Sequence, residues 1–448
     1  MSGKRIEKRS RRQVDLGQLR LWPILVVLPI SFIFAVAGLG LLALAAWAWL
    51  HFPALPHPKS ISLHDWISIL QLVFASVAGA GALVALIVTY RRQRVAEADS
   101  IRDRTRVFNE RFIAIAAQLG DPQAAIRLAG VHAMAGLADE WEENRQTCVD
   151  VLCAYLRMPY EPTPGVGAST AEQLAFGGNH EVRHTVIRVI ATHLRPGATT
   201  SWQGIDLDFT GVQFDGGNFT GVQFSAGTIR FTGARFLAGT VDFGGAIFSG
   251  GTVDFSTAKF SGGRVRFSDA QFSGGTIDFS YAQFSGRVLF TGAKFSGSTV
   301  RFTRAAFIGD MVRFGYAKFS GGTVDFTRAI LSRGEIRFGN AQFSAGAEIT
   351  FAYAIFSGGS VRFGEARFSG AMINFVGVQF SGSTFYFGDA QFSGGSVRFS
   401  KAKFSGGMVR FINAQFSGGD VDFHDIADWS HPPMFSFTGS PPPGVKLP

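Results

Sequence analysis

A regular spacing of phenylalanine dominates the second half of the chain. In the stretch "AKFSGGRVRFSDAQFSGGTIDFSYAQF" (258–284), Phe recurs at alternating intervals of seven and five residues. From Phe209 to Phe423 there are 37 such positions, of which 36 are Phe and one is Leu331. Two residues before each position is a smaller apolar residue, usually Ala, Val or Ile. Because strand residues two apart share a face, each pair predicts a short strand with an apolar inner face and a polar outer face.

Units this short cannot bury an apolar face alone, so they are expected to stack on one another as a solenoid. Ser and Gly fill the gaps between strands, where Gly supports tight backbone turns. Two coil sizes fit the spacing. Two successive twelve-residue units make a four-sided coil of 24 residues, whereas a single unit per coil makes a flat, two-sided solenoid.

The residue directly before each Phe that ends a seven-residue interval is expected to point outward. The pattern of these residues along the chain favours the 24-residue coil. With that coil, alternate units share a face, and one face is mostly Arg: Asp242, Arg266, Leu289, Arg313, Arg337, Arg362, Tyr386 and Arg410. The other face is mixed and rich in Asp: Arg230, Asp254, Asp278, Arg301, Asp325, Thr350, Asn374, Arg398 and Asp422. One unit, ending at Phe295, has eleven residues, and another, ending at Phe356, has thirteen. We expect these differences in length to be accommodated at the corners.

Two long apolar segments precede the repeat. Residues 21–50 contain no charged residue, nor do residues 66–90, and about 20 apolar residues span a bilayer core. Basic residues crowd residues 1–20 and the stretch after residue 90, whereas the connection between the segments holds only Lys59. The positive-inside rule then predicts a transmembrane helical hairpin over 21–90 in the cell (inner or plasma) membrane, with both chain ends cytoplasmic. A cleaved signal peptide is the alternative, but the length of the first segment and the presence of a second favour the hairpin.

Residues 91–198 show apolar positions at helical spacing, interrupted by Pro and Gly, which predicts a cytoplasmic α-helical domain. This domain is expected to cap the first edge of the solenoid, and the Pro-rich tail 424–448 the last.

His180 and His184, four residues apart, could share a metal ion, but no Cys or carboxylate at a suitable spacing completes a site. They are interpreted as exposed helix surface. Cys148 and Cys153 are interpreted as small packing residues.

The units "AKFSG", "AQFSG" and "GVQFD" resemble the pentapeptide-repeat family over residues 203–423. That resemblance implies a right-handed quadrilateral β-helix with the central residues stacked inside. The order of hairpin, helical region and Gly-Gly repeat also resembles uncharacterised membrane-anchored bacterial pentapeptide-repeat proteins. The extra two residues in every second unit depart from the family's five-residue pattern.

Charge narrows the possible functions. The whole chain has a formal net charge of +9, and two cysteines exclude a disulfide framework. Residues 205–423 contain 20 Lys and Arg against 15 Asp and Glu, which disfavours mimicry of DNA, since mimicry needs rows of carboxylates. No nucleophile lies beside a base, and no metal cluster or phosphate-binding loop is evident. We therefore expect no enzyme activity, no cofactor and no metal.

These observations predict a membrane-anchored scaffold whose rigid rod binds a protein partner. The candidate interaction face is the Arg column, Arg266, Arg313, Arg337, Arg362 and Arg410. It suits an acidic protein or anionic lipid near the anchor. The alternatives are that these arginines only keep a Phe-rich rod soluble, or that a rod face contacts DNA or a topoisomerase. The identity of the partner and possible homo-oligomerisation stay open.

Overall fold

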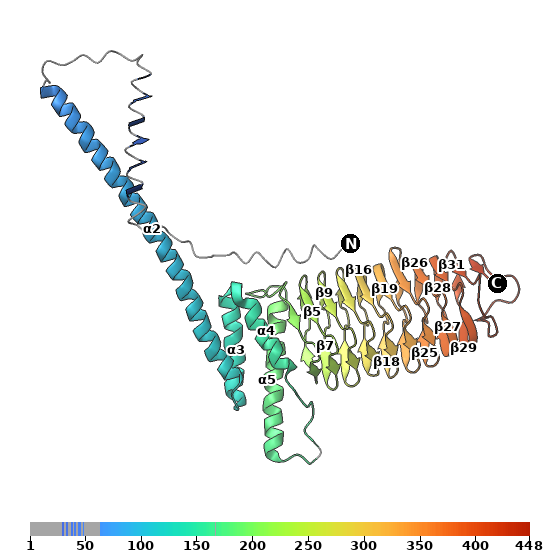
Figure 1. Ribbon diagram of the computed structural model, residues 1–448. Coiled ribbons are helices and arrows are strands. Elements are labelled where there is room, and N and C mark those ends of the chain that lie inside the picture. The colour runs from blue at the N-terminus through green and yellow to red at the C-terminus, as the bar shows by residue number, and fades with distance from the viewer. Residues whose placement is uncertain are drawn as a thin grey trace. The chain divides into compact units, whose positions relative to one another are not determined.

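The computed structural model describes residues 63–448, except Val166, together with scattered positions between 29 and 48 (Figure 1). The contacts divide the chain into two units, Met1–Val107 and Phe108–Pro448, and each is described by itself. The basic segment 1–20 and much of the first predicted span, 21–50, lie outside the described residues.

The long helix α2 (Leu63–Leu119) contains the second predicted span and continues through residues 90 and 91 without a break. Several large apolar side chains of this helix are exposed, among them Ile67, Phe74 and Leu86. Among the described residues, no helix combines the length and apolar character that crossing a membrane requires.

Four further helical elements precede the solenoid: α3 (Ala124–Glu140), the short 3₁₀ helix η1 (Glu142–Asn144), α4 (Arg145–Arg157) and α5 (Thr170–Leu194). The helix α5 begins at a capping box in which Ser169 and Glu172 each satisfy the other's backbone N–H. A Cβ at Gly178 of α5 would lie 2.8 Å from the Cβ of Ala124, so glycine is needed where α3 approaches α5. The predicted helical region is thereby confirmed.

Thirty-three short strands then form two sheets in which every pairing is parallel. Sheet A has 16 strands: β1 (Leu207–Asp208), β4 (Gln223–Phe224), β5 (Thr228–Arg230), β8 (Ile247–Phe248), β9 (Thr252–Asp254), β12 (Gln271–Phe272), β13 (Thr276–Asp278), β16 (Lys294–Arg301), β19 (Lys318–Asp325), β22 (Gln342–Phe343), β23 (Ala347–Thr350), β26 (Arg367–Asn374), β28 (Gln391–Arg398), β30 (Gln415–Phe416), β31 (Asp420–Asp422) and β33 (Val445–Lys446).

Sheet B has 17 strands: β2 (Gln213–Phe214), β3 (Gly217–Asn218), β6 (Arg235–Phe236), β7 (Thr240–Asp242), β10 (Lys259–Phe260), β11 (Arg264–Arg266), β14 (Gln283–Phe284), β15 (Arg287–Leu289), β17 (Ala306–Phe307), β18 (Met311–Arg313), β20 (Ile330–Leu331), β21 (Glu335–Arg337), β24 (Ile355–Phe356), β25 (Ser360–Arg362), β27 (Gln379–Tyr386), β29 (Lys403–Phe411) and β32 (Met434–Phe435).

The chain alternates between two strand segments in sheet A and two in sheet B (Figure 1). In several later coils the two segments of one sheet join into a single longer strand, such as β26 or β29. Successive coils pair 24 residues apart, as Lys259 with Gln283 and Ile277 with Val253. The 24-residue coil is therefore confirmed, and the twelve-residue coil is excluded. Across the eleven-residue unit that ends at Phe295, strands pair 23 residues apart, as Gln271 does with Lys294. The thirteen-residue unit that ends at Phe356 has its additional residue between Phe343 and Phe351.

The interior is a set of stacked phenylalanine columns. Of the 37 repeat positions, 36 are buried, and only Phe416 in the last full coil is partly exposed. Within one column the rings are nearly parallel, with centroids 4.8 Å apart for Phe255 and Phe279. Rings of neighbouring columns meet edge to face, as Phe267 and Phe279 do at 6.0 Å. Both arrangements are favourable for aromatic pairs, so the core gains energy along and across the coil.

Two kinds of corner connect the strands. Between sheets, a four-residue turn is closed by a hydrogen bond such as that from Ala258 N–H to the Phe255 carbonyl, and its third residue, Thr257, has a φ of 57°. Within a sheet, the Ser-Gly-Gly segment bends the strand. A Cβ at Gly262 would lie 1.9 Å from the Leu237 carbonyl oxygen of the preceding coil. The bend therefore requires glycine because adjacent coils approach too closely for a side chain.

Both ends of the solenoid are covered, as predicted. At the first edge, helix side chains satisfy the open backbone: Gln146 bonds both to the Asp206 N–H and to its carbonyl, and Arg157 donates to the Asp208 carbonyl. At the last edge, tail strands β32 and β33 pair with β29 and β31. Paired edges do not offer a free template for another chain.

Candidate functional site

The structure places the predicted interaction residues in one column on sheet B. Arg266 lies between Asp242 and Leu289 in adjacent coils, and the pairing continues through Arg313, Arg337, Arg362, Tyr386 and Arg410. We call this column, Asp242 to Arg410, the Arg ladder. All five predicted site residues belong to it. The mixed column of Asp and Arg lies on sheet A, in the corresponding register.

Some ladder arginines are neutralised locally. Arg266 pairs with Asp242 at 3.2 Å, and Glu335 forms ion pairs with Arg337 at 2.6 Å and with Arg362 at 2.7 Å. Within the described residues, Arg313 and Arg410 have no acidic group within 4.0 Å. The buried Nε atoms of Arg337 and Arg410 likewise lack a hydrogen-bond partner there. The charges of Arg313 and Arg410 are therefore not neutralised by an acidic group of the described chain.

The equivalent column of sheet A has a structural role that arginine cannot fill. Asp254, Asp278 and Asp325 each accept a hydrogen bond of 2.8 Å from the backbone N–H two residues later, which supports the following turn. Thr350, Asn374 and Asp422 do the same. A guanidinium has no acceptor. Most ladder positions thus forgo a turn-stabilising hydrogen bond worth about 1 kcal/mol.

A strip of glycine runs beside the middle of the ladder. Gly315, Gly339, Gly364 and Gly388 each lie two residues after a ladder residue, and the equivalent positions of sheet A carry no glycine. The ladder side chains lie over this strip: a Cβ at Gly388 would be 2.0 Å from the Tyr386 ring, and one at Gly315 3.7 Å from the Arg313 Cγ. The recurring Phe-Gly pair after a ladder residue is visible in the sequence. Only the fold shows that these glycines leave room for the ladder side chains.

The two sheets differ in charge. Strands of sheet B carry ten Lys or Arg and two Asp or Glu, a net of +8, whereas strands of sheet A carry seven of each and are neutral. The additional cations of sheet B, such as Arg264 and Lys259, lie in neighbouring columns. One side of the solenoid is thus a basic surface that extends over many coils.

A second cluster lies where α5 meets the first coil. His180 and His184 lie beside Asp215, whose side chain is only 7% exposed. Burial opposes ionisation of Asp215, but hydrogen bonds from His184 and Tyr160 outweigh it and hold the pKa of this carboxyl below its ordinary value. Sequence spacing did not reveal this carboxylate because it comes from the solenoid and not from the helix.

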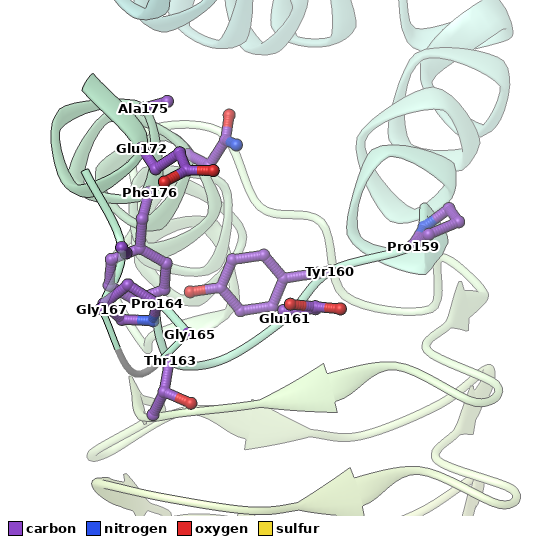
Figure 2. A pocket seen from close by; sticks show the side chains of 12 residues that line it. Pro159, Tyr160, Glu161, Thr163, Pro164, Gly165, Gly167, Glu172, Ala175 and Phe176 are labelled. Atoms are coloured by element: carbon purple, nitrogen blue, oxygen red, sulfur yellow. The ribbon is translucent and has the colours of Figure 1, made fainter. Parts of the chain in front are cut away.

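An open pocket of about 580 Å³ lies next to this cluster (Figure 2). Tyr160 and Phe176, which Figure 2 shows facing one another, line it, and their rings stack at 6.1 Å. Glu172 also lines the pocket, but its carboxylate is engaged with Ser169 in the helix cap.

The comparisons with known proteins agree with the repeat. Residues 279–330 match the family model described as Pentapeptide repeats (9 copies). No curated protein matches the chain, and no solved structure matches it. The matched segment lies inside the stacked coils and includes two Arg-ladder residues, Leu289 and Arg313. Residues 279–330 thus carry pentapeptide repeats, and the coils on either side continue the same β-solenoid.

Proposed function

We propose that this protein is a non-enzymatic, membrane-anchored scaffold in the cytoplasm whose solenoid binds an acidic protein through the Arg ladder. The observation that carries the proposal is the difference between the two equivalent columns. On sheet B, five of the eight ladder residues are Arg and only Asp242 accepts the turn-supporting hydrogen bond, whereas on sheet A three of nine are Arg and six accept it. If solubility alone were required, cations could lie on either sheet. Their concentration on one sheet, at positions where they forgo hydrogen bonds, favours a binding role.

The chemistry of the surface suits a flat, acidic partner. Arginine forms paired hydrogen bonds to carboxylates, and its guanidinium is weakly hydrated, so a row of arginines suits rows of Asp or Glu. Coil spacing places successive ladder residues about 4.8 Å apart, comparable to the spacing of strands in a partner sheet. Tyr386 within the ladder adds an aromatic group of the kind enriched at binding surfaces.

The test is a photo-crosslinker at position 386 in the full chain, read out by the crosslinked protein species. A ladder variant with Arg313, Arg337, Arg362 and Arg410 changed to Gln should lose the species. A matched control changes Arg230, Arg301 and Arg398 of sheet A to Gln and should retain it. Unchanged crosslinking of the ladder variant, with unchanged thermal stability, contradicts the proposal.

The membrane anchor is supported by the uncharged segments 21–50 and 66–90 and by the exposed apolar side chains of α2, such as Phe74 and Leu86. We expect the full chain to stay in the membrane pellet after an alkaline wash, and a chain lacking residues 21–90 to become extractable. Release of the full chain by that wash contradicts anchoring by these segments.

The net charge of +8 on sheet B favours one alternative, a nucleic-acid partner. A flat surface contacts few phosphates, so binding of duplex DNA should be weak at physiological salt and fall steeply as salt rises. Tight DNA binding that the ladder variant loses and the sheet A control keeps would favour nucleic acid over an acidic protein.

A further inference from the structure

We propose that His180, His184 and Asp215 form a binding site for a divalent transition-metal ion such as Zn²⁺, which joins the helical region to the first coil. One potential ligand atom from each residue lies within 4.8 Å of the others. Two imidazole nitrogens and a carboxylate oxygen are a ligand set typical of Zn²⁺ and related ions. The solenoid supplies the third ligand that the helix lacks.

The distances are close to those that coordination needs. Four-coordinate Zn²⁺ with bonds of about 2.1 Å separates its ligand atoms by about 3.4 Å. The His184 Nε2 lies 3.0 Å from the Asp215 Oδ1, and the His180 Nε2 lies 3.7 Å from the Oδ2. The two imidazole rings stack with centroids 4.0 Å apart, as expected for residues one turn apart on a helix. Small side-chain rotations therefore suffice to bind an ion.

The groups around the cluster support a ligand role for Asp215. The Tyr160 hydroxyl donates to its Oδ2 at 2.5 Å, as hydrogen-bond donors commonly do to carboxylates that bind a metal. Arg183 holds this phenol in place, since its guanidinium lies 4.2 Å from the ring centroid while it donates to the Gln213 carbonyl. Binding would replace the hydrogen bond between His184 and Asp215, and where Nε2 carries the proton of the neutral ring, that proton would move to Nδ1 so that Nε2 can bind the ion.

The cluster is also accessible. The His180 side chain is 38% exposed, and its ring contacts Phe176, which lines the pocket of Figure 2. An ion could enter from that side and take water as its fourth ligand. Gly216 permits the arrangement, because a Cβ there would lie 3.0 Å from the His184 Cε1. Asp215 also differs from the Ser that follows Phe in most later coils, so this carboxylate is particular to the first coil.

The experiment titrates Co²⁺ into purified, chelator-treated full-length protein and follows the visible d–d absorption of the bound ion. Zn²⁺ should then displace Co²⁺ and raise the melting temperature of the wild type. We expect saturation at one equivalent. The variants His180→Ala and Asp215→Asn should abolish this binding, and Tyr160→Phe should weaken it about tenfold because it removes the hydrogen bond to the Asp215 carboxylate.

The matched control is His424→Ala. His424 and Asp422 form an exposed His–Asp pair at 3.0 Å that has no second imidazole, so its loss should leave the titration unchanged. His180 is partly exposed, and its removal should leave circular dichroism unaltered, which makes this variant decisive even if Asp215→Asn unfolds. Absence of saturable binding to the wild type, or wild-type binding by His180→Ala, overturns the proposal.

Discussion

At the scale of single residues, stability is concentrated in side chains that stack between coils. Phe279 is fully buried and lies between Phe255 at 4.8 Å and Phe302 at 4.9 Å. Each ring therefore packs against a ring in the coil before it and a ring in the coil after it. Removal of one ring leaves a cavity that the rigid columns cannot close.

Replacement of Phe279 by Ala should lower the free energy of unfolding by about 3–5 kcal/mol. The control Phe279→Leu should cost only about 1.5 kcal/mol, since the chain itself buries Leu331 at an equivalent position. Urea denaturation followed by circular dichroism measures both. Equal midpoints for the two variants would contradict the cavity argument, since Leu retains most of the buried volume and Ala does not.

The two cysteines give a second prediction at this scale. Both are fully buried, and burial raises the pKa of Cys148 to about 11 and that of Cys153 to about 12. Since the unfolded thiols lose their protons at lower pH than the folded ones, the helical region should lose stability as pH rises above the ordinary thiol value.

At pH 8 only about one Cys148 thiol in a thousand is ionised, so a thiol reagent should react with the native protein hardly at all. Both thiols should react once urea unfolds the helices. Rapid labelling of the native chain at pH 8 would contradict their burial. The interpretation of these cysteines as packing residues is confirmed by the structure.

At the scale of elements, the bend and the turn impose different demands on glycine. The bend needs it because the preceding coil's backbone lies against it, as Leu237 does against Gly262. The turn needs a positive φ, which the chain supplies with Gly233 in one coil and Thr257 in the next. Only at the bend is glycine required because the backbone of a neighbouring coil is too close for a side chain.

Gly262→Ala should therefore destabilise the protein by about 3 kcal/mol, because the new Cβ would overlap the Leu237 carbonyl and separate the coils. The control Gly339→Ala, where the nearest atom to a Cβ is 3.7 Å away and φ is not positive, should change stability little. Thermal melts of the two variants should differ by several degrees. Similar melts would show that neighbouring coils can shift apart freely.

At the scale of the whole molecule, the solenoid depends on its covered ends. Removal of the tail 424–448 deletes strands β32 and β33 and leaves the outer edges of β29 and β31 unpaired. Open parallel edges recruit other chains. We expect the shortened protein to form dimers or larger assemblies by light scattering coupled to size exclusion, at a concentration where the full chain shows fewer. An unchanged size distribution would mean that the tail is not needed as a cap.

The architecture of the repeat could be predicted from the sequence because it depends on the spacing of residues that lie close together in the chain. The spacing of Phe determines which residues face inward, and the segregation of Arg from Asp indicated the 24-residue register, which the strand pairings confirm. The handedness of the coil remains a prediction from the family resemblance. The cluster around Asp215 could not be found in this way, since Asp215 follows His184 by 31 positions in the sequence. That meeting depends on how α5 packs on the first coil, which no periodic pattern encodes.

The 24-residue coil also constrains how such a chain can change in length. Because the repeating unit is half a coil, duplication or loss of a single unit would transfer every later residue to the opposite sheet. Arg313 and Arg337 would then continue the column of Asp254, and the basic surface would be divided between two sides. Only changes by paired units preserve it. Parity of repeat number, and not length alone, therefore determines whether a related protein could present the same surface.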